Sequence, residues 1–402
     1  MCNDKKRSRL DELIQELCQN GVEYKAIGDC VHKTQNIKWA SANGTYSYID
    51  LTSVDRDTHQ IIEAQTIDAN NAPSRAQQIV QTDDVLFATT RPTLKRYCII
   101  DNRYDGQICS TGFCVLRANR AIVLPRWLYH AISSSEFFYY VEANQKGASY
   151  PAISDKEVKQ FKIPVPPLPV QSEIVRILDN FTELTAELTA ELTARKKQYE
   201  YYRETLLAFH DNEQCAISNV QWKTLGEVCN ISAGGDAPKD SMSKQKTEKY
   251  TVPIISNGIG ENALYGYTDA PKVVEPSVTV AARGTIGYAE YRDYPFYPII
   301  RLLTAIPKDT STVNTKYLYY CLQGKQYSVP MGGIPQLTAP ELKKVEVPIP
   351  SIKVQNHIVS ILDRFDFLCN DISSGIPAEI EARQKQYEYY RDKLLAFHEI
   401  SN

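Results

Sequence analysis

A stretch of 21 residues occurs twice in this chain of 402 residues. The first copy, AELTARKKQYEYYRETLLAFH, spans residues 190–210, and the second, AEIEARQKQYEYYRDKLLAFH, spans residues 378–398. Chance does not produce a match of this length at two distant places. The chain therefore contains a duplicated long helix with a large segment before each copy, which predicts a fold built as two similar halves.

The repeat extends well beyond these 21 residues. Shorter matches occur in the same order in both halves, and they pair 22–29 with 220–227, 86–93 with 278–285, 127–129 with 317–319, 161–166 with 345–350, and 171–181 with 355–365. In the 86–93 match, Arg91 and Arg283 hold the same position. The predicted layout is a globular region, a long helix, a second globular region and a second long helix.

The globular regions are predicted to be β-rich with a few helices. Runs such as 85–89 and 278–282 are apolar and β-branched, and Asn-Gly pairs at 43–44 and 257–258 mark turns. Each region ends in a Pro-rich segment, IPVPPLP or VPIPSIK, which resists helix formation and marks a boundary. The fold class is therefore α+β, with a globular domain at 1–165, a helical region at 166–210, a second globular domain at 211–350 and a second helical region at 351–402.

Both long helices show the spacing of a coiled coil. Apolar and aromatic residues, with one arginine in each copy (Arg195 and Arg383), recur at alternating intervals of four and three residues in 188–209 and again in 376–397. Two such helices in one chain most simply pack on each other, antiparallel if the halves form a pseudo-two-fold pair. The tyrosines in this seam suit a surface that is partly wet or shared with another protein.

The two helical regions differ at one place. Residues 182–194 repeat the four-residue unit TAEL about three times, whereas the corresponding 370–377 carries Gly375 and Pro377, which should interrupt the helix. The TAEL units have two readings: they set the length of a ruler, or they are replication slippage in a surface helix.

Composition restricts the functional class. No window approaches 18 uncharged apolar residues, the first residues have no apolar stretch of a signal peptide, and the ten cysteines form no CxxC pair or Cys/His cluster. We therefore expect a cytoplasmic protein with reduced thiols, no membrane span and no metal. The net charge of −3 argues against a non-specific nucleic-acid coat but allows a specific reader of duplex DNA, the commonest two-fold object in a cell.

The sequence predicts no catalytic site. It contains no GxxxxGK[ST] loop, no GxSxG elbow and no Asn/Asp-Pro-Pro-aromatic motif of amino-methyltransferases. The Gly-rich stretches at 232–236 and 331–334 are interpreted as turns. His210 and His398 recur at helix ends, where capping is the favoured role.

What remains is recognition chemistry. An arginine fork matches guanine or phosphate, and Asn or Gln matches adenine. The candidate DNA-binding residues, weighed against the alternative that basic side chains are simply solvated, are Lys33, Arg75, Arg91, Lys95, Arg96, Lys146, Asn257, Arg283, Thr285, Tyr288, Arg301 and Gln336.

These features together resemble the specificity (S) subunits of type I restriction–modification systems, and the TAEL units resemble type IC. The resemblance rests on the helix QSEIVRILD…RKKQYEYYR…LL with its second copy, the Pro-rich lead-in and the WKxLGE opening of the second globular region. It implies two target-recognition domains that each read half of a split DNA site, and antiparallel helices that set the spacer. The chain is then a non-catalytic DNA-reading subunit.

The resemblance also implies partners. Two modification subunits would carry methyltransferase chemistry with S-adenosylmethionine, and restriction subunits would carry ATP- and Mg-dependent translocase and nuclease activity, so this chain itself holds no cofactor. The expected docking residues on the helices are Tyr199, Tyr202, Arg203, Phe209, Tyr387, Tyr390, Arg391 and Phe397. Two alternatives stay open: a two-fold coiled-coil scaffold that binds only proteins, and a self-sufficient DNA methyltransferase.

Overall fold

The computed structural model describes residues 8–209, 220–327, 335–371 and 374–400. The chain divides into two compact units. The first unit combines the chain up to Ala190 with Ala378–Asn402, and the second unit is Glu191–Pro377. Each unit therefore contains one globular domain, the start of the long helical region that follows it, and the end of the long helical region of the other half of the sequence.

The first globular domain is built on two larger sheets and one short strand pair. A four-stranded antiparallel sheet has the order β2 (Val31–His32), β10 (Phe113–Ala118), β7 (Val85–Ala88), β8 (Tyr97–Ile99). A five-stranded sheet has the order β3 (Gln35–Asn36), β6 (Ala76–Ile79), β9 (Ile108–Ser110), β4 (Tyr46–Ile49), β5 (Gln65–Ile67). The short pair joins β1 (Glu23–Ala26) to β11 (Lys162–Val165).

The second globular domain repeats the antiparallel sheet of the first, whereas its second sheet has four strands in place of five. Its antiparallel sheet has the order β13 (Cys229–Ala233), β20 (Leu302–Pro307), β17 (Ser277–Ala281), β18 (Ala289–Arg292). Its second sheet has the order β14 (Met242–Ser243), β16 (Leu264–Thr268), β15 (Val252–Ile255), β19 (Tyr297–Pro298), and β12 (Gln221–Thr224) pairs with β21 (Glu346–Ile349). The parallel pair β4–β9 of the first domain returns as β15–β19.

Each unit also contains short helices, of which α2 and α7 pack on the antiparallel sheets. The first unit has α1 (Arg9–Leu17), α2 (Pro125–Ser133), α3 (Ser135–Asn144) and α4 (Asp155–Gln160), and the second has α6 (Leu225–Val228), α7 (Thr315–Leu322) and α8 (Ala339–Lys343). Capping boxes start α4 at Ser154 and α8 at Thr338. Trp127 of α2 and Tyr317 of α7 are fully buried, and each donates a hydrogen bond to the Pro-rich strand of its domain, at Pro164 O and Pro348 O.

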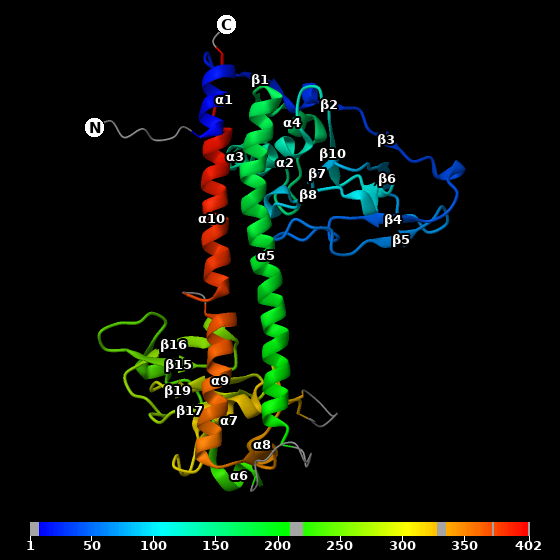
Figure 1. Cartoon of the computed structure of the whole chain (residues 1–402). Coiled ribbons are helices and arrows are strands. Elements are labelled where there is room, and N and C mark those ends of the chain that lie inside the picture. The colour runs from blue at the N-terminus through cyan, green and yellow to red at the C-terminus, as the bar shows by residue number, and fades with distance from the viewer. Residues whose placement is uncertain (1–7, 210–219, 328–334, 372–373, 401–402) are drawn as a thin grey trace, which may run out of the picture. The chain divides into compact units, whose positions relative to one another are not determined.

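The long helices begin directly after the Pro-rich segments. Helix α5 runs without interruption from Leu168 to Leu207, whereas the second region is split into α9 (Ile352–Asn370) and α10 (Ile376–Leu395), as Gly375 and Pro377 predict. In the first unit α5 runs antiparallel to α10, and in the second unit it runs antiparallel to α9 (Figure 1). No helix in the described ranges has the length and apolar character to cross a membrane.

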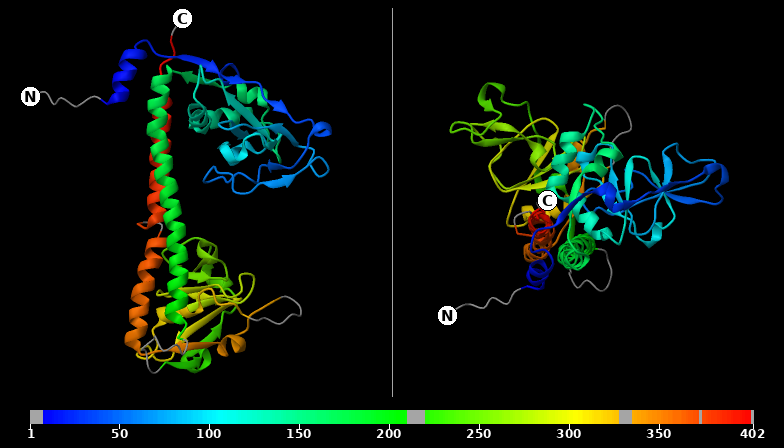
Figure 2. Two further views of the ribbon diagram at one scale, coloured as in Figure 1. Left: turned by 45° about the vertical axis from the view of Figure 1, so that its right-hand side comes forward. Right: turned by 90° about the horizontal axis from the view of Figure 1, so that it is seen from above.

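A buried glutamine fixes the start of each long helix to its own domain. Gln171 of α5 and Gln355 of α9 have no exposed surface. The Gln171 side chain accepts from Leu124 N (2.9 Å) and donates to Ile122 O and Pro166 O. Gln355 makes the three equivalent bonds, to Asn314 N, Thr312 O and Pro350 O. Three hydrogen bonds from each glutamine therefore anchor the first turn of a long helix to the domain before it. Figure 2 shows the ribbon of each of these helices starting beside its own domain.

The strand registers correct one match made on the sequence. Phe113 pairs with Ala88 in the first domain, and Leu302 pairs with Ala281 in the second. Ala88 is thus equivalent to Ala281, so Arg91 is level with Gly284 rather than with Arg283. The one-residue slip arose because a short apolar run fits two registers equally well in sequence, whereas side chains on a strand alternate between faces.

Candidate nucleic-acid interface

In the first domain, three predicted cations gather where strand β7 ends. Arg91 and Lys95 flank a short 3-10 helix, Pro92–Leu94, and both have left-handed backbone conformations with φ of 48° and 53°. The Arg91 N–H donates to Pro151 O (2.7 Å), and its guanidinium lies 4.4 Å from the centre of the Tyr150 ring. The loop after β7 is therefore joined to the turn at 146–152.

Lys146 enters the same edge from that turn. Its backbone pairs with Ala152, which also bridges Thr90 at the end of β7. The Lys146 ammonium lies 3.0 Å from Glu157, with 82% of the lysine side chain exposed. The pKa of Glu157 is lowered to about 2, first by the Ser154 backbone N–H of the capping box and then by Lys146. Arg91, Lys95 and Lys146 thus form an exposed basic edge, which we call the Arg91 edge.

The remaining candidates of the first domain lie elsewhere. The Arg96 guanidinium donates to the carbonyls of Leu51 (2.8 Å) and Val54, so it stabilises the loop after β4. A basic residue next to a strand end looks the same in sequence whether it faces solvent or a backbone carbonyl. Lys33 and Arg75 are exposed, and their side chains bond to none of the described residues.

In the second domain, four candidates from three separate loops come together. The Asn257 side chain donates to Arg283 O (2.5 Å), and the Thr285 hydroxyl donates to Asn257 O (3.1 Å). Arg301, with a left-handed φ of 73°, accepts at its carbonyl from Ala282 N (2.9 Å). The loops after β15 and β17 and the turn before β20 are therefore tied into one edge.

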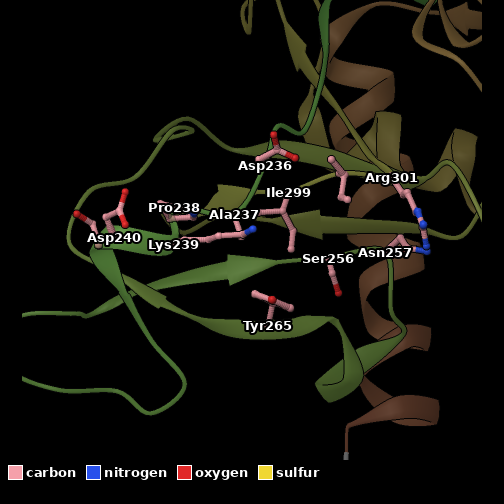
Figure 3. A pocket seen from close by; sticks show the side chains of 12 residues that line it. Asp236, Ala237, Pro238, Lys239, Asp240, Ser256, Asn257, Tyr265, Ile299 and Arg301 are labelled. Carbon is pink, nitrogen blue, oxygen red and sulfur yellow. The ribbon is translucent and has the colours of Figure 1, made fainter.

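This edge borders a hollow of about 850 Å³ (Figure 3). The hollow is lined by Asn257, Arg301 and Tyr265, together with Asp236, Lys239 and Asp240. Of these six residues, the sequence analysis had named only Asn257 and Arg301. The available signal was the Gly234-Gly235 pair, which had been interpreted as part of a turn. A Cβ on Gly234 would lie 2.1 Å from Ile299 O, so the glycine permits a close approach of two chain segments. We call this site the Arg301 hollow.

Two further candidates lie beside the same loops. Tyr288 is half-buried, and burial followed by the Glu290 charge raises the pKa of its hydroxyl. It lines a separate hollow of about 690 Å³ with Tyr319 and Gln323. Gln336 is exposed, and its neighbour Leu337 donates a backbone hydrogen bond to Ala282 O (2.8 Å), next to Arg283.

Most of the predicted docking residues are already used within the chain. Tyr199 of α5 is 7% exposed and donates to the Gln323 side chain of the second domain (2.6 Å). Its repeat partner, Tyr387 of α10, bonds to His130 (2.8 Å) and lies 3.3 Å from the Ser133 hydroxyl of the first domain. We call these two sites the tyrosine sockets. Helix α10, from the second half of the sequence, packs on the first domain. Helix α5, from the first half, packs on the second domain.

The tyrosine sockets are built on equivalent positions with different residues. His130 in the first is replaced by Tyr320 in the second, and both bond to an aspartate of a long helix, at 2.8 Å and 2.5 Å respectively. That aspartate is Asp179 in the first unit and Asp363 in the second, and it also pairs with Arg126 (3.2 Å) or Lys316 (2.9 Å). The polar pattern is therefore kept while the side chains change.

The other predicted docking residues also contact their own chain. Tyr390 stacks on Phe181 with ring centres 5.5 Å apart, and Tyr202 packs on Phe365 at 5.4 Å. Arg391 is 5% exposed and bonds to Asp392. The remaining three are half-buried, with Arg203 against Gly324, Phe209 packed on the buried cluster that includes Tyr317 and Ile358, and Phe397 beside Trp127.

The outward face of the helices carries tyrosines that the seam pattern does not include. Tyr201 is 65% exposed and Tyr389 is 61% exposed, and they are equivalent positions of the duplicated QYEYYR motif. Each packs edge-on against the next tyrosine, at 5.6 Å and 5.3 Å. Because each ring packs on its neighbour and is still largely exposed, this pair is suited to contact another protein.

The described residues contain no group of three or more His, Cys, Asp or Glu side chains that could hold a metal ion. The chemistry on offer at both domain edges is hydrogen bonding and charge. Exposed guanidinium, ammonium and amide groups occur at strand ends and on loops, which is the arrangement that recognises phosphates and base edges.

Comparison with known proteins identifies relatives for both halves. Residues 19–195 and 217–382 each match the family described as the type I restriction modification DNA specificity domain. A Mycoplasma pneumoniae protein named as a type I specificity subunit, S.MpnORF89P, is 34% identical over 304 residues, covering 72% of this chain and 88% of its own. The Escherichia coli EcoR124I/EcoR124II specificity subunit is 36% identical over 275 residues, covering 61% of this chain and 65% of its own.

Solved structures show the same fold. A chain from a structure of a type I restriction–modification system matches with a TM-score of 0.62 at 24% identity, covering 93% of this chain and 97% of that one. The S subunit from Mycoplasma genitalium matches with a TM-score of 0.56 at 14% identity, covering 93% of this chain and 96% of that one.

Proposed function

Because the chain belongs to the family of type I restriction–modification DNA specificity subunits, we propose that its two β-rich domains each read one half of a bipartite DNA site. The observation that carries this proposal is the duplicated domain itself. Each copy has the same four-stranded antiparallel sheet, and one of its inner strands, β7 or β17, ends in a loop with exposed polar and basic side chains. Shared topology with different loop residues is what two readers of two different half-sites require.

The chain is a recognition subunit and not an enzyme. Its polar clusters serve packing, as in the tyrosine sockets, or lie open at the domain edges. We therefore assign methyl transfer with S-adenosylmethionine to modification subunits, and ATP- and Mg-dependent translocation and cleavage to restriction subunits. We propose that such a complex acts in the cytoplasm, where chromosomal DNA is accessible to it.

The helices are proposed to dock two modification subunits. Tyr201 and Tyr389 supply one exposed aromatic anchor on each copy of the repeated helix. They replace Tyr199 and Tyr387 in this role, since those side chains fill the tyrosine sockets. Two equivalent anchors on one chain fit two copies of one partner.

The long helices are also proposed to set the spacer between the half-sites. Each domain grips the first turn of its own helix through Gln171 or Gln355 and grips the other half's helix through its tyrosine socket. Helix length should therefore determine how far apart the two half-sites are read.

Domain exchange tests the recognition proposal. Residues 211–350 are replaced by the equivalent region of a related subunit, and the methylated sites of a strain carrying the hybrid are mapped by methylome sequencing. The second half-site should change while the first stays the same, because each domain folds on its own core. The reciprocal exchange of residues 1–165 is the control and should change only the first half-site. If either exchange altered both halves, the two domains would not be independent readers.

A further inference from the structure

The Arg301 hollow contains opposite charges that do not pair. Arg301 and Asp236 both line it, yet neither side chain forms an ion pair or hydrogen bond within the described part of the chain. An arginine and a carboxylate that share a hollow without meeting leave donors on one side and acceptors on the other. Such an arrangement fits a ligand that presents acceptors to the first group and a donor to the second.

The position of Asp236 is fixed by the chain that precedes it. Gly234 N donates to Leu302 O (2.8 Å), and Gly235 forms a parallel bridge with Ile299. Because a Cβ on Gly234 would lie within 2.1 Å of Ile299 O, only glycine allows this contact. The segment is therefore attached to the turn that carries Arg301, and the two charged residues are held in one frame.

Arg301 is presented by a backbone conformation that costs energy. Its φ of 73° is in the left-handed region, which is unfavourable for a residue with a Cβ. The hydrogen bond from Ala282 N to Arg301 O stabilises this turn. The exposed guanidinium then borders the hollow beside Asn257, as Figure 3 shows. Strain of this kind is typically retained where a side chain must point at a ligand.

We propose that the Arg301 hollow determines base specificity in the second half-site, with Arg301 donating to guanine and Asp236 accepting from an exocyclic amino group. This inference rests on the proposed function. A carboxylate near DNA is repelled by phosphates, so it is favourable only where it accepts a hydrogen bond from a base. Two exocyclic amino groups are candidates in the major groove. One is N4 of the cytosine that is paired with the guanine, and the other is N6 of an adenine in a neighbouring base pair.

The test uses the full chain assembled with its modification subunits. Binding is selected from DNA in which the first half-site is kept and the second is randomised. Asp236→Asn should reduce the preference for cytosine or adenine at one position at least about fivefold, the lower end for a base contact. Arg301→Lys, which keeps the charge but loses the fork, should reduce the preference for guanine at one position. The base whose preference falls with Asp236→Asn distinguishes cytosine from adenine.

Two matched variants distinguish loss of base recognition in Asp236→Asn from a general change of charge and from structural damage. Asp293→Asn removes a carboxylate from the same domain outside the hollow and should leave every preference unchanged, whereas Asp236→Glu keeps the carboxylate and should retain the preference. The inference is overturned if Asp236→Asn only strengthens binding to all sequences, as Asp293→Asn also could, or leaves the base profile unchanged. If the wild-type complex shows no base preference anywhere in the randomised half-site, the proposed function itself fails.

Discussion

At the scale of single residues, the two tyrosine sockets differ in one titratable group. His130 in the first socket has no exposed surface and is enclosed by Asp179, Tyr387, Arg126 and Arg391. Burial lowers the pKa of His130 below 6.5 although its hydrogen bond to Asp179 acts in the opposite direction. The imidazole is therefore neutral in the folded protein at neutral pH. The second socket has Tyr320 at this position and so has no imidazole.

A neutral buried histidine makes stability depend on pH in a defined direction. Just below pH 6.5 the unfolded state binds a proton that the folded state does not, so the free energy of unfolding falls as the pH falls. The slope from one residue is at most about 1.4 kcal/mol per pH unit. His130→Tyr combined with Ser133→Gln, which transfers the second socket's residues, should flatten the slope measured by denaturant unfolding between pH 7.5 and 5.5. The reverse pair, Tyr320→His with Gln323→Ser, should steepen it, and equal slopes in all three proteins would contradict the role of His130.

The exposed tyrosines allow a second test at this scale. Tyr201→Asp with Tyr389→Asp should weaken association with modification subunits by roughly tenfold or more, because exposed aromatic anchors dominate interface energies. Isothermal titration measures the affinity, and thermal unfolding should be unchanged because neither ring enters a core. Tyr139→Asp, at a tyrosine that is 73% exposed on α3, is the matched control. Full association of the double variant would remove Tyr201 and Tyr389 from the docking surface.

At the scale of elements, the two helical regions are unequal in a way that concerns spacing. Helix α5 is continuous for 40 residues, whereas α9 ends at Asn370 and α10 begins at Ile376. In α5, Thr185 and Thr189 each donate to the carbonyl four residues earlier, at 2.9 Å and 2.8 Å, so these hydroxyls are satisfied within the helix. The TAEL units are therefore compatible with helix of any length.

Deleting Ala186–Thr189 removes one unit and shortens α5 by roughly 6 Å, from a rise of about 1.5 Å per residue. Four residues are close to a full turn, so the seam keeps its facing. We expect both half-site sequences to be preserved and the spacer to shorten by no more than about two base pairs, given about 3.4 Å per step. Methylome sequencing measures this directly. Deleting only two residues rotates the seam by about 200° and should disrupt packing. An active four-residue deletion with an unchanged spacer would favour replication slippage.

At the scale of the whole molecule, sequence reasoning predicted the architecture better than the surfaces. Long identical segments and intervals of four and three residues specify the duplicated helices and their seam. The four candidates at the edge of the Arg301 hollow lie on three loops that the structure brings together, and their contact with DNA stays a prediction. Asp236 was missed because its role depends on a close chain approach at Gly234, which leaves no trace except glycine. Arg96 was misread because solvent and backbone carbonyls are indistinguishable in sequence.

The exchange of helices between halves could not be predicted at all. The QYEYYR motif is identical in both copies, so the sequence does not reveal which domain each copy contacts. The structure places Tyr199 on the second domain and Tyr387 on the first. Each half of the sequence thus contains one tyrosine socket and also the tyrosine that fills the socket of the other half.

It follows that a fragment containing only the first half of the chain should form a homodimer. Residues 1–210 contain the His130 socket and Tyr199, so two copies can exchange helices in the way the two halves do. Light scattering should give the mass of a dimer, and Tyr199→Asp should give a monomer. A wild-type fragment that is folded by circular dichroism but monomeric would contradict this.

The shared socket therefore suggests a history for the gene. An ancestral chain of half this length could have worked as a self-paired dimer on a palindromic site, with no requirement for a second reader. Duplication and fusion would then have freed each domain to drift separately, since the helix motif had to stay common while the loops did not. The identical QYEYYR motif and the different loops of the two domains are the pattern that such a history would leave within one chain.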